Sequence, residues 1–291
     1  MARSATNALP IPTLRELATS LEASMLECLA KPAKRSVHKL RTSTRRVEAQ
    51  LELLAMLPEL PAHAKPREKL LRLLKKLRRA AGEVRDLDVQ RDLIADDTPA
   101  KRSAKSKSSS QSAELRKEAG QLRRELKTRR EKLANDLVDL LKQEKAQLPL
   151  VFGQLYDSLK PAESLSISQS DLTSLVCTWY NRRASATPPD PADTELLHNI
   201  RKQAKLARYL AESAPESASK AQRLAARFED LQEAGGEWHD WLLLAELARN
   251  ELDRSALLPG RFTAHADKAL RIFERRIAKM TSKTSSLAVA A

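Results

Sequence analysis

The sequence is 291 residues long and 42% hydrophobic, so it can bury a substantial core as one or two domains. Few glycines, 6 in all, together with abundant Ala, Leu, Glu, Lys and Arg, favour an all-α protein. The formal net charge of +14 makes an anionic partner the default expectation, whether nucleic acid, a membrane surface or a polyanion, and two cysteines exclude a disulfide framework.

The N-terminal residues do not resemble a signal peptide. Residues 1–12 lack the necessary apolar run, and no stretch of the chain approaches the length needed to span a bilayer. Cys28 and Cys177 lie far apart among apolar residues with helical spacing, so we interpret them as buried free thiols in a reducing compartment. We therefore expect a soluble, cytoplasmic protein without a membrane partner.

Two helices are predicted after Pro12 and after Pro32, the second running to about Leu57. In the second helix, apolar or small residues recur every three or four positions and form a stripe that faces a core. An adjacent face, about 10 Å long, carries a ladder of hydrogen-bond donors. Its members are His38, Arg41 and Arg45, and Lys39 and Arg46 flank it; the candidate ligand-binding residues of this helix are His38, Arg41, Arg45 and Arg46. Considered alone, such a face is also compatible with a merely solvated basic surface.

A third helix is predicted after Pro66, with a buried leucine stripe and a second basic ladder on another face. The candidate ligand-binding residues of this ladder are Lys69, Arg72, Lys76 and Arg79. Gly82 is expected to end this helix in a left-handed conformation, and a fourth helix is expected to begin at about Arg85.

Two aspartates are candidate orienting residues, and each has two possible roles. Asp86 either caps the predicted fourth helix or holds Arg41 or Arg45 in a bidentate pair that aims the guanidinium. Asp240 offers the same choice in the second half of the chain.

The middle of the chain divides it into two predicted halves, residues 12–147 and 148–280. Residues 96–113 are rich in Ser and Lys and are predicted to form a mobile loop, after which a long charged helix reaches about residue 147. In the second half we predict a helix around His198 and further helices at 171–186, 216–234, 237–253 and 262–281. The tail at 281–291 is predicted to be disordered.

Two blocks of the first half return in the second half. The segment Leu197–Arg208 repeats the His-Arg spacing of the His38 helix 160 residues later. The segment Gly82–Leu87 is matched by Gly236–Trp241 at an offset of 154. Matched blocks in the same order indicate an internal duplication. The second set of candidate ligand-binding residues is His198, Arg201, Lys205 and Arg208.

These motifs resemble the CHAD family, helical domains named for their histidines. The resemblance covers roughly residues 12–280 and is most specific at H-x-x-R-x-x-x-R-R (38–46), H-x-x-R-x-x-x-K-x-x-R-Y (198–209) and G-x-x-R-D (82–86). It implies two pseudo-symmetric helical bundles around a central basic pore that binds inorganic polyphosphate, and it suggests a place on polyphosphate granules. The sequence departs from the family pattern at Glu48, where a basic residue is usual, and at His239, which stands where G-x-x-R-D has arginine. The strand signature of the CYTH domain that accompanies many members is absent.

Several features argue against catalysis and metal binding. The sequence has no Gly-rich phosphate loop, no His-Glu-x-x-His and no Cys-x-x-Cys. Cations, not carboxylates, stand three and seven residues after His38 and after His198, and these neighbouring cations would repel Zn²⁺. We therefore expect a protein that is not an enzyme, needs no cofactor and binds polyphosphate, since repeated cations suit a repeating ligand.

Nucleic acid is the main alternative partner. Binding of single strands usually requires aromatic platforms, but aromatic residues are only 3% of the sequence and none lies in the His38 helix or the third helix. Duplex binding through phosphates alone stays open, with residues 101–110 as a nonspecific arm. A helical adaptor for an acidic protein is a third alternative.

Overall fold

The structure, a computed structural model, describes residues 6–58, 60–98, 109–184 and 193–289. Within these ranges the fold is all-α, as the composition predicts, and the only strand-like pairing is a bridge between Ala8 and Ile167. The helices in chain order are α1 (Pro10–Ala30), α2 (Lys34–Ala55), α3 (Ala64–Asp97), α4 (Ser109–Glu144), α5 (Gln147–Leu159), the short 3₁₀ helix η3 (Lys160–Ala162), α6 (Gln169–Arg183), α7 (Thr194–Ala211), α8 (Ser219–Glu251) and α9 (Leu258–Val289).

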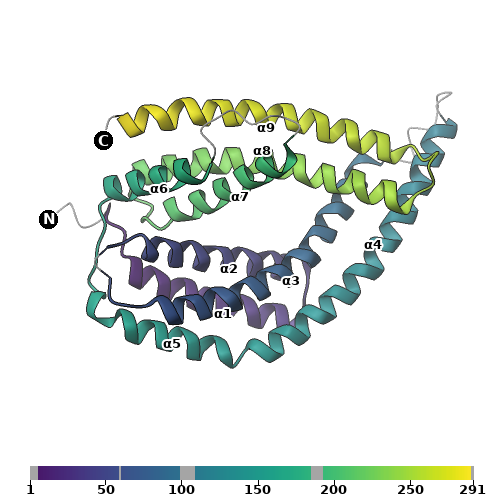
Figure 1. Ribbon diagram of the computed structural model, residues 1–291. Coiled ribbons are helices and arrows are strands. Elements are labelled where there is room, and N and C mark those ends of the chain that lie inside the picture. Colours follow the sequence, from purple (N-terminus) through teal and green to yellow (C-terminus); the bar gives the residue numbers. More distant parts are fainter. Residues whose placement is uncertain (1–5, 59, 99–108, 185–192, 290–291) are drawn as a thin grey trace.

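The helices form two layers, which Figure 1 shows one above the other. The layer drawn below contains α1, α2, α3 and α5, the layer drawn above contains α6 to α9, and α4 connects the two along one side. Between the layers, α2 packs against α7 and α3 packs against α8. These two contacts bring the predicted basic helices of both halves together.

Each layer has its own hydrophobic cluster. The first cluster contains fully buried leucines of α1 to α5, spaced as the sequence predicts; on α3 they are Leu70, Leu74 and Leu77. The second cluster joins α6 to α9 around Phe228 and Phe273. Burial of each such side chain stabilises the fold by about 1.5–3 kcal/mol. The chain thus carries two cores rather than one.

Helix α5 belongs to the first core, although the sequence pattern predicts a division of the chain at residue 148. Leu148, Val151 and Phe152 of α5 pack in the first cluster, because α5 folds back onto α3. Helix α4 contributes to both hydrophobic clusters, since Leu137 packs in the first cluster and Leu122 in the second. The long helix therefore bridges the cores instead of projecting into solvent.

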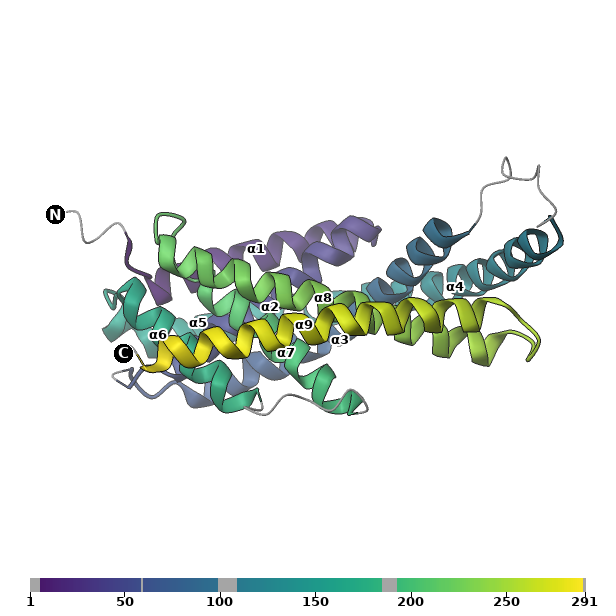
Figure 2. The same cartoon turned by 90° about the horizontal axis from the view of Figure 1, so that it is seen from above.

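Contacts at one end of the molecule join α3 and α4 to α9, and Figure 2 shows these helix ends side by side. Asp97 at the end of α3 accepts hydrogen bonds from the guanidinium of Arg261 at 2.6 and 2.8 Å. The Glu118 carboxylate of α4 accepts from the backbone N–H groups of Leu257 and Leu258 at 2.9 Å each, so it caps the N-terminus of α9.

The predicted end of a helix at Gly82 is wrong, and so is the predicted division of residues 216–253 into two helices. Helix α3 continues through Gly82, and α8 continues through Gly235 and Gly236; every described glycine has negative φ. A glycine inside a helix costs only about 1 kcal/mol, and the buried apolar residues on both sides outweigh that cost. Gly82 instead allows close packing, because a Cβ there would lie 3.6 Å from Nε of Arg41.

We expect Gly235→Ala to reduce the free energy of unfolding by about 1–3 kcal/mol. A Cβ at this position would lie 2.7 Å from Cε2 of Phe273 and 3.1 Å from Cγ of Arg201. Gly236→Ala is the matched control, since its Cβ would meet nothing within 4 Å and alanine is the better helix former. Urea unfolding of both variants measures the difference. Equal effects of the two substitutions would contradict the close packing at Gly235.

Two other segments differ from the sequence-based expectation. The predicted loop at 96–113 contains the end of α3 and the start of α4, and residues 99–108 lie outside the described ranges. The tail predicted to be disordered from residue 281 continues α9 to Val289, because no Pro or Gly interrupts the helical sequence; residues 290–291 are not described.

The prediction that Cys28 and Cys177 are buried free thiols is confirmed. Burial raises the pKa of Cys28 to about 11. No helix in the described part of the chain combines the length and apolar character that a membrane span requires.

Candidate functional site

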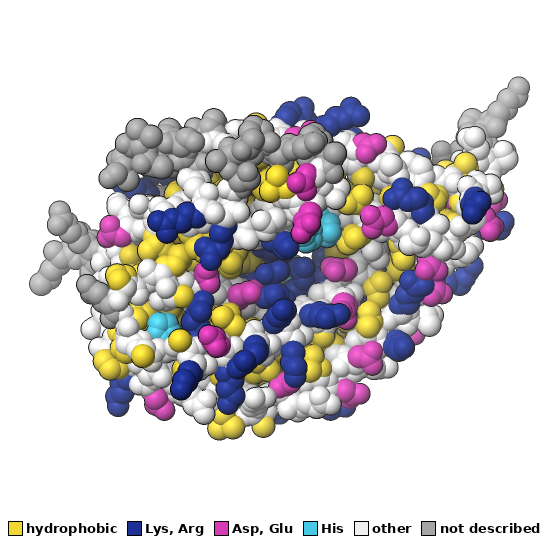
Figure 3. All heavy atoms as spheres, in the orientation of Figure 1, with side chains coloured by type: hydrophobic (Ala, Val, Ile, Leu, Met, Phe, Trp, Pro, Cys, Tyr) yellow, Lys and Arg dark blue, Asp and Glu magenta, His cyan; other side chains and the backbone are white. Residues whose placement is uncertain are grey.

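Basic side chains from α2, α3, α7 and α8 meet between the two layers. Their mutual electrostatic effects connect them into one group, which we call the cationic cluster. Its members are His38, Arg41, Arg45, Arg78, Arg85, His198, Arg201, Lys205, Arg208 and His239. On the face seen in Figure 3, Lys and Arg side chains gather in a hollow between the layers.

The repeated motifs of α2 and α7 face each other in this cluster. The charge of Arg41 on α2 lowers the pKa of Arg201 on α7, and the charge of Arg45 acts in the same way on the pKa of Lys205. On both helices the neighbouring stripe is buried, with Val37 and Leu40 on α2 and their counterparts on α7. The apolar stripe therefore fixes the direction of the basic face, as the helical spacing predicts.

Four buried guanidinium N–H groups of the cluster have no acceptor among the described residues. They are Nε of Arg41, Nε of Arg45, Nη1 of Arg85 and Nε of Arg201. A buried donor without a partner costs about 1–3 kcal/mol, and most such groups in proteins are paired. These four donors are therefore available to an anion.

The cluster holds its histidines in the neutral form. Burial, followed by Arg85, Lys205 and Arg41, lowers the pKa of His38. Burial and Arg201 lower the pKa of His198 to about 4 and that of His239 to about 3, and the centroids of these two rings are 4.6 Å apart. Burial and the surrounding arginines also lower the pKa of Lys205 to about 7.

Asp86 and Asp240 lie in the interior of α3 and α8, so the capping role predicted as one alternative is wrong. Neither carboxylate forms an ion pair with Arg41 or Arg45 in the described part of the chain, although both act electrostatically on Arg201. Burial raises the pKa of Asp86, and burial together with Asp86 raises the pKa of Asp240 to about 6. The two acids thus face the cluster at longer range than a bidentate pair.

Three glutamates bind cations of the cluster directly. Glu48 pairs with Arg45, at 3.2 Å, and with Arg78. Glu212 pairs with Arg208, from Nε to Oε1 at 2.6 Å, and with Arg46 at 3.6 Å. Glu229 pairs with Arg208 at 2.8 Å. Arg46 itself is half exposed and lies at the rim.

The basic ladder predicted on the third helix does not point into the cluster. Lys76 donates to Glu144 of α4 at 2.9 Å, and the largely exposed Arg79 pairs with Glu83 on its own helix. Arg72 is exposed, and Lys69 shares its side of the helix. At 100° per residue these positions lie on the side of α3 away from Arg78 and Arg85, which enter the cluster in their place.

Sequence reasoning did not select Arg78, Arg85 and His239. A signal was available for each of them: Arg78 and Arg85 are seven residues apart, with Gly82 on the same face, and His239 is the counterpart of Arg85 at the offset of 154. Gly82 packs against Arg41, so its face is the one that approaches α2.

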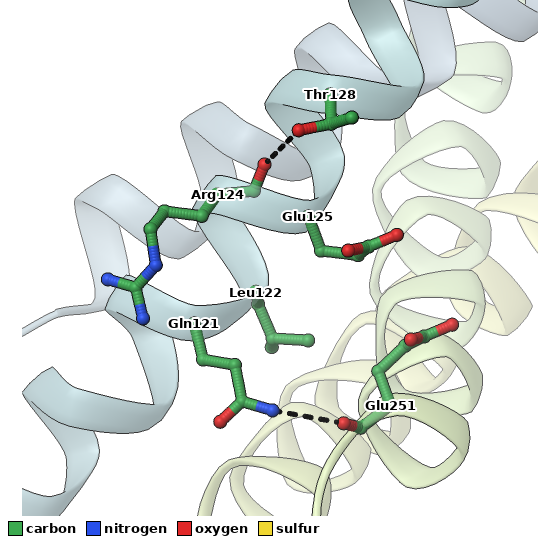
Figure 4. A pocket seen from close by; sticks show the side chains of 6 residues that line it. All are labelled: Gln121, Leu122, Arg124, Glu125, Thr128 and Glu251. Carbon is green, nitrogen blue, oxygen red and sulfur yellow. Dashed lines mark hydrogen bonds between the residues drawn. The ribbon is translucent and has the colours of Figure 1, made fainter.

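A separate pocket lies between α4 and the C-terminal end of α8, as Figure 4 shows. Gln121 donates to the backbone carbonyl of Glu251 at 3.3 Å there, and the carboxylates of Glu125 and Glu251 both bind Arg129. Its lining combines the carboxylates of Glu125 and Glu251 with the guanidinium of Arg124 and contains no residue of the cationic cluster. Among the described residues, no group of three or more His, Cys, Asp or Glu side chains is arranged to hold a metal ion.

The fold and the site together define a helical domain with a cationic cluster between its two layers, to which α2, α3, α7 and α8 contribute side chains. The sequence model of the CHAD domain matches residues 14–249, so the chain belongs to the CHAD domain family, a polyphosphate-related family, and no CYTH domain is evident.

Two solved structures are similar to this chain. PptA from Streptomyces chartreusis is 16% identical with a TM-score of 0.59, and the match covers 91% of this chain and 99% of that one. The CHAD domain from the plant Ricinus communis is 17% identical with a TM-score of 0.48, over 99% of this chain and 93% of that one. The first likeness supports the fold alone. The comparison with curated proteins gives no match.

Proposed function

We propose that this protein binds inorganic polyphosphate in the cationic cluster and does not transform it. The observation that carries the proposal is the set of four buried guanidinium N–H groups without acceptors. Phosphate oxygens accept charge-assisted hydrogen bonds from such groups, and each bond is worth about 1.5–3 kcal/mol. A bound polyanion would also relieve the mutual repulsion of the cluster.

The arrangement of the donors supports a linear ligand. On α2 the cluster extends from His38 to Arg45, about 10 Å of helix, and on α7 it extends from His198 to Arg208, about 15 Å. Because the two helices present cations to the same space, the ligand path we propose is a basic channel between the layers. A chain with one charge per unit suits such a path better than a single compact anion does.

The protonation state of the site supports binding without catalysis. His38 and His198 lie beside cations that lower their pKa, so they are poor general bases and suit hydrogen bonding to phosphate oxygens. Accordingly we propose no reaction step and no cofactor. A place on polyphosphate granules in the cytoplasm is part of the same proposal.

Polyphosphate is favoured over single-stranded nucleic acid because the aromatic side chains that could stack on bases are buried. Phe228, Tyr209 and Trp238 are at most 7% exposed and lie in the second core. The cluster itself consists of His, Lys and Arg only.

A competition experiment tests the proposal. Labelled polyphosphate is bound to the full chain and displaced with unlabelled polyphosphate or with duplex DNA at equal total charge. We expect polyphosphate to compete at least about ten times better and to raise the melting temperature of the protein, since the cationic cluster is assembled only in the folded state. Equal competition by DNA, or an unchanged melting curve at saturating polyphosphate, would contradict the proposal.

A further inference from the structure

The cationic cluster has two chemically different ends. Ser213 donates a hydrogen bond to Oε1 of Gln50 at 2.8 Å, so the C-terminal ends of α7 and α2 lie side by side. Arg41 and Arg201 interact further toward the N-terminal ends of the same helices. The two helices therefore run in the same direction, and the cluster extends from a histidine end, near His38, to a carboxylate end, near Glu48.

At the histidine end, no carboxylate of the described residues lies within ion-pair distance of Arg41, Arg85 or Arg201. Nε of Arg41, Nη1 of Arg85 and Nε of Arg201 are all buried and without an acceptor among the described residues. The nearest acids, Asp86 and Asp240, act only through space, and burial raises the pKa of both. This end is ready to accept an anion without breaking an existing ion pair.

At the carboxylate end each arginine already has a carboxylate partner, although Nε of Arg45 is left without an acceptor among the described residues. Glu48 binds Arg45 and Arg78, and Glu212 and Glu229 bind Arg208 at 2.6 and 2.8 Å. The side chains of Arg45, Arg78 and Arg208 are each about 20% exposed, so these pairs are only partly screened by solvent. A phosphate that enters this end has to displace a carboxylate and is repelled by it.

We propose that Glu48 and Glu212 are specificity-determining residues that limit how many phosphate units of a chain the site engages. They act as built-in competing anions, so a polyphosphate chain is held tightly at the histidine end and only weakly at the carboxylate end, where each phosphate competes with a carboxylate. This inference rests on the proposed function. It predicts that a short phosphate chain satisfies the site nearly as well as a long one.

The test compares Glu48→Gln, Glu212→Gln and the double variant with wild type, using tripolyphosphate and a long polyphosphate of defined length. Glutamine keeps the size of the side chain but removes the competing charge. We expect the double variant to bind the long chain about ten times more tightly, with a steeper salt dependence, and tripolyphosphate within about twofold of wild type.

Glu83→Gln is the matched control, because it removes the same charge from an exposed glutamate that pairs with Arg79 outside the cluster. Affinity for tripolyphosphate that rises as much as affinity for the long chain, or an equal gain in Glu83→Gln, would overturn the inference in favour of a general field effect. Should Glu48→Gln fold poorly, Glu212→Gln and the more exposed Glu229→Gln carry the same comparison. A wild-type protein that binds neither probe would refute the proposed function, whereas binding without discrimination by these variants refutes only the role of the glutamates.

Discussion

Replacing Arg41 and Arg201 together with alanine is expected to weaken polyphosphate binding at least about a hundredfold. Each side chain presents a buried Nε–H without an acceptor, and the two act on each other across α2 and α7. Charge-assisted hydrogen bonds of about 1.5–3 kcal/mol each, lost from both arginines, amount to two orders of magnitude or more. Titration of the variant with labelled polyphosphate at constant ionic strength measures the loss.

The free protein should not be destabilised by this double substitution. Removal of the two guanidinium groups eliminates unpaired buried donors and like-charge repulsion, so the melting temperature without ligand is expected to stay the same or rise. The variant Arg72→Ala with Arg79→Ala is the matched control, since it removes two charges from the exposed side of α3. A similar loss of affinity in the control would mean that net charge, and not the cluster, binds the ligand.

The basic faces of α2 and α7 could be predicted from the sequence because each lies beside a regular apolar stripe. Once Val37 and Leu40 point into the core, the helix period alone places His38 and Arg41 on the adjacent face. The same holds for α7, where the motif recurs with the same phase. Here local spacing determines the direction of the side chains.

The side of α3 that faces the cationic cluster could not be predicted in this way. Its sequence is basic on more than one side, and the leucine stripe alone does not say which basic side faces α2 and which faces α4. Ion pairs with neighbouring helices distinguish the two sides of α3. Lys76 pairs with Glu144 of α4, and Arg78 pairs with Glu48 of α2. These carboxylates are distant in sequence, so the pairing is a property of the tertiary fold.

The roles assigned to Gly82 and Asp86 failed for a related physical reason. Both assignments assumed a helix boundary, which glycine and aspartate favour locally by about 1 kcal/mol each. Packing of Leu77, Val84 and Ile94 into the cores favours one continuous helix by more than that. Asp86 is thereby placed inside α3, where it faces the cluster and cannot cap a helix.

Affinity for polyphosphate is expected to increase at least about tenfold between pH 8 and pH 6. Burial and neighbouring cations lower the pKa of Lys205 to about 7 and hold His38, His198 and His239 in the neutral form. A bound polyanion favours positive charge, so it raises each of these pKa values toward or above its ordinary range. The complex therefore holds more protons than the free protein, and binding strengthens as the pH falls.

The remaining titratable groups of the site change affinity in the same direction. Asp240 has a pKa of about 6, and a neighbouring phosphate would raise it further, so protonation of this acid also accompanies binding. The pH windows differ, however. Lys205 takes up a proton on binding at pH values above about 7, because its pKa in the free protein is about 7. The histidines take up protons on binding below pH 7, down to the pKa values of about 4 for His198 and about 3 for His239.

Calorimetric titration with a long polyphosphate at pH 8, 7 and 6, in two buffers of different ionisation enthalpy, measures both the affinity and the number of protons taken up.

Variants assign the pH dependence to individual groups. Lys205→Arg keeps its charge over the whole pH range, so affinity should change less between pH 8 and 7 and as in wild type between pH 7 and 6. His198→Gln with His239→Gln should flatten the lower part instead. His63→Gln, outside the cluster, should change neither. Proton release on binding, or equal affinity at pH 8 and pH 6, would remove Lys205 and the histidines from the ligand path, because a polyanion cannot lie beside these groups without raising their pKa values.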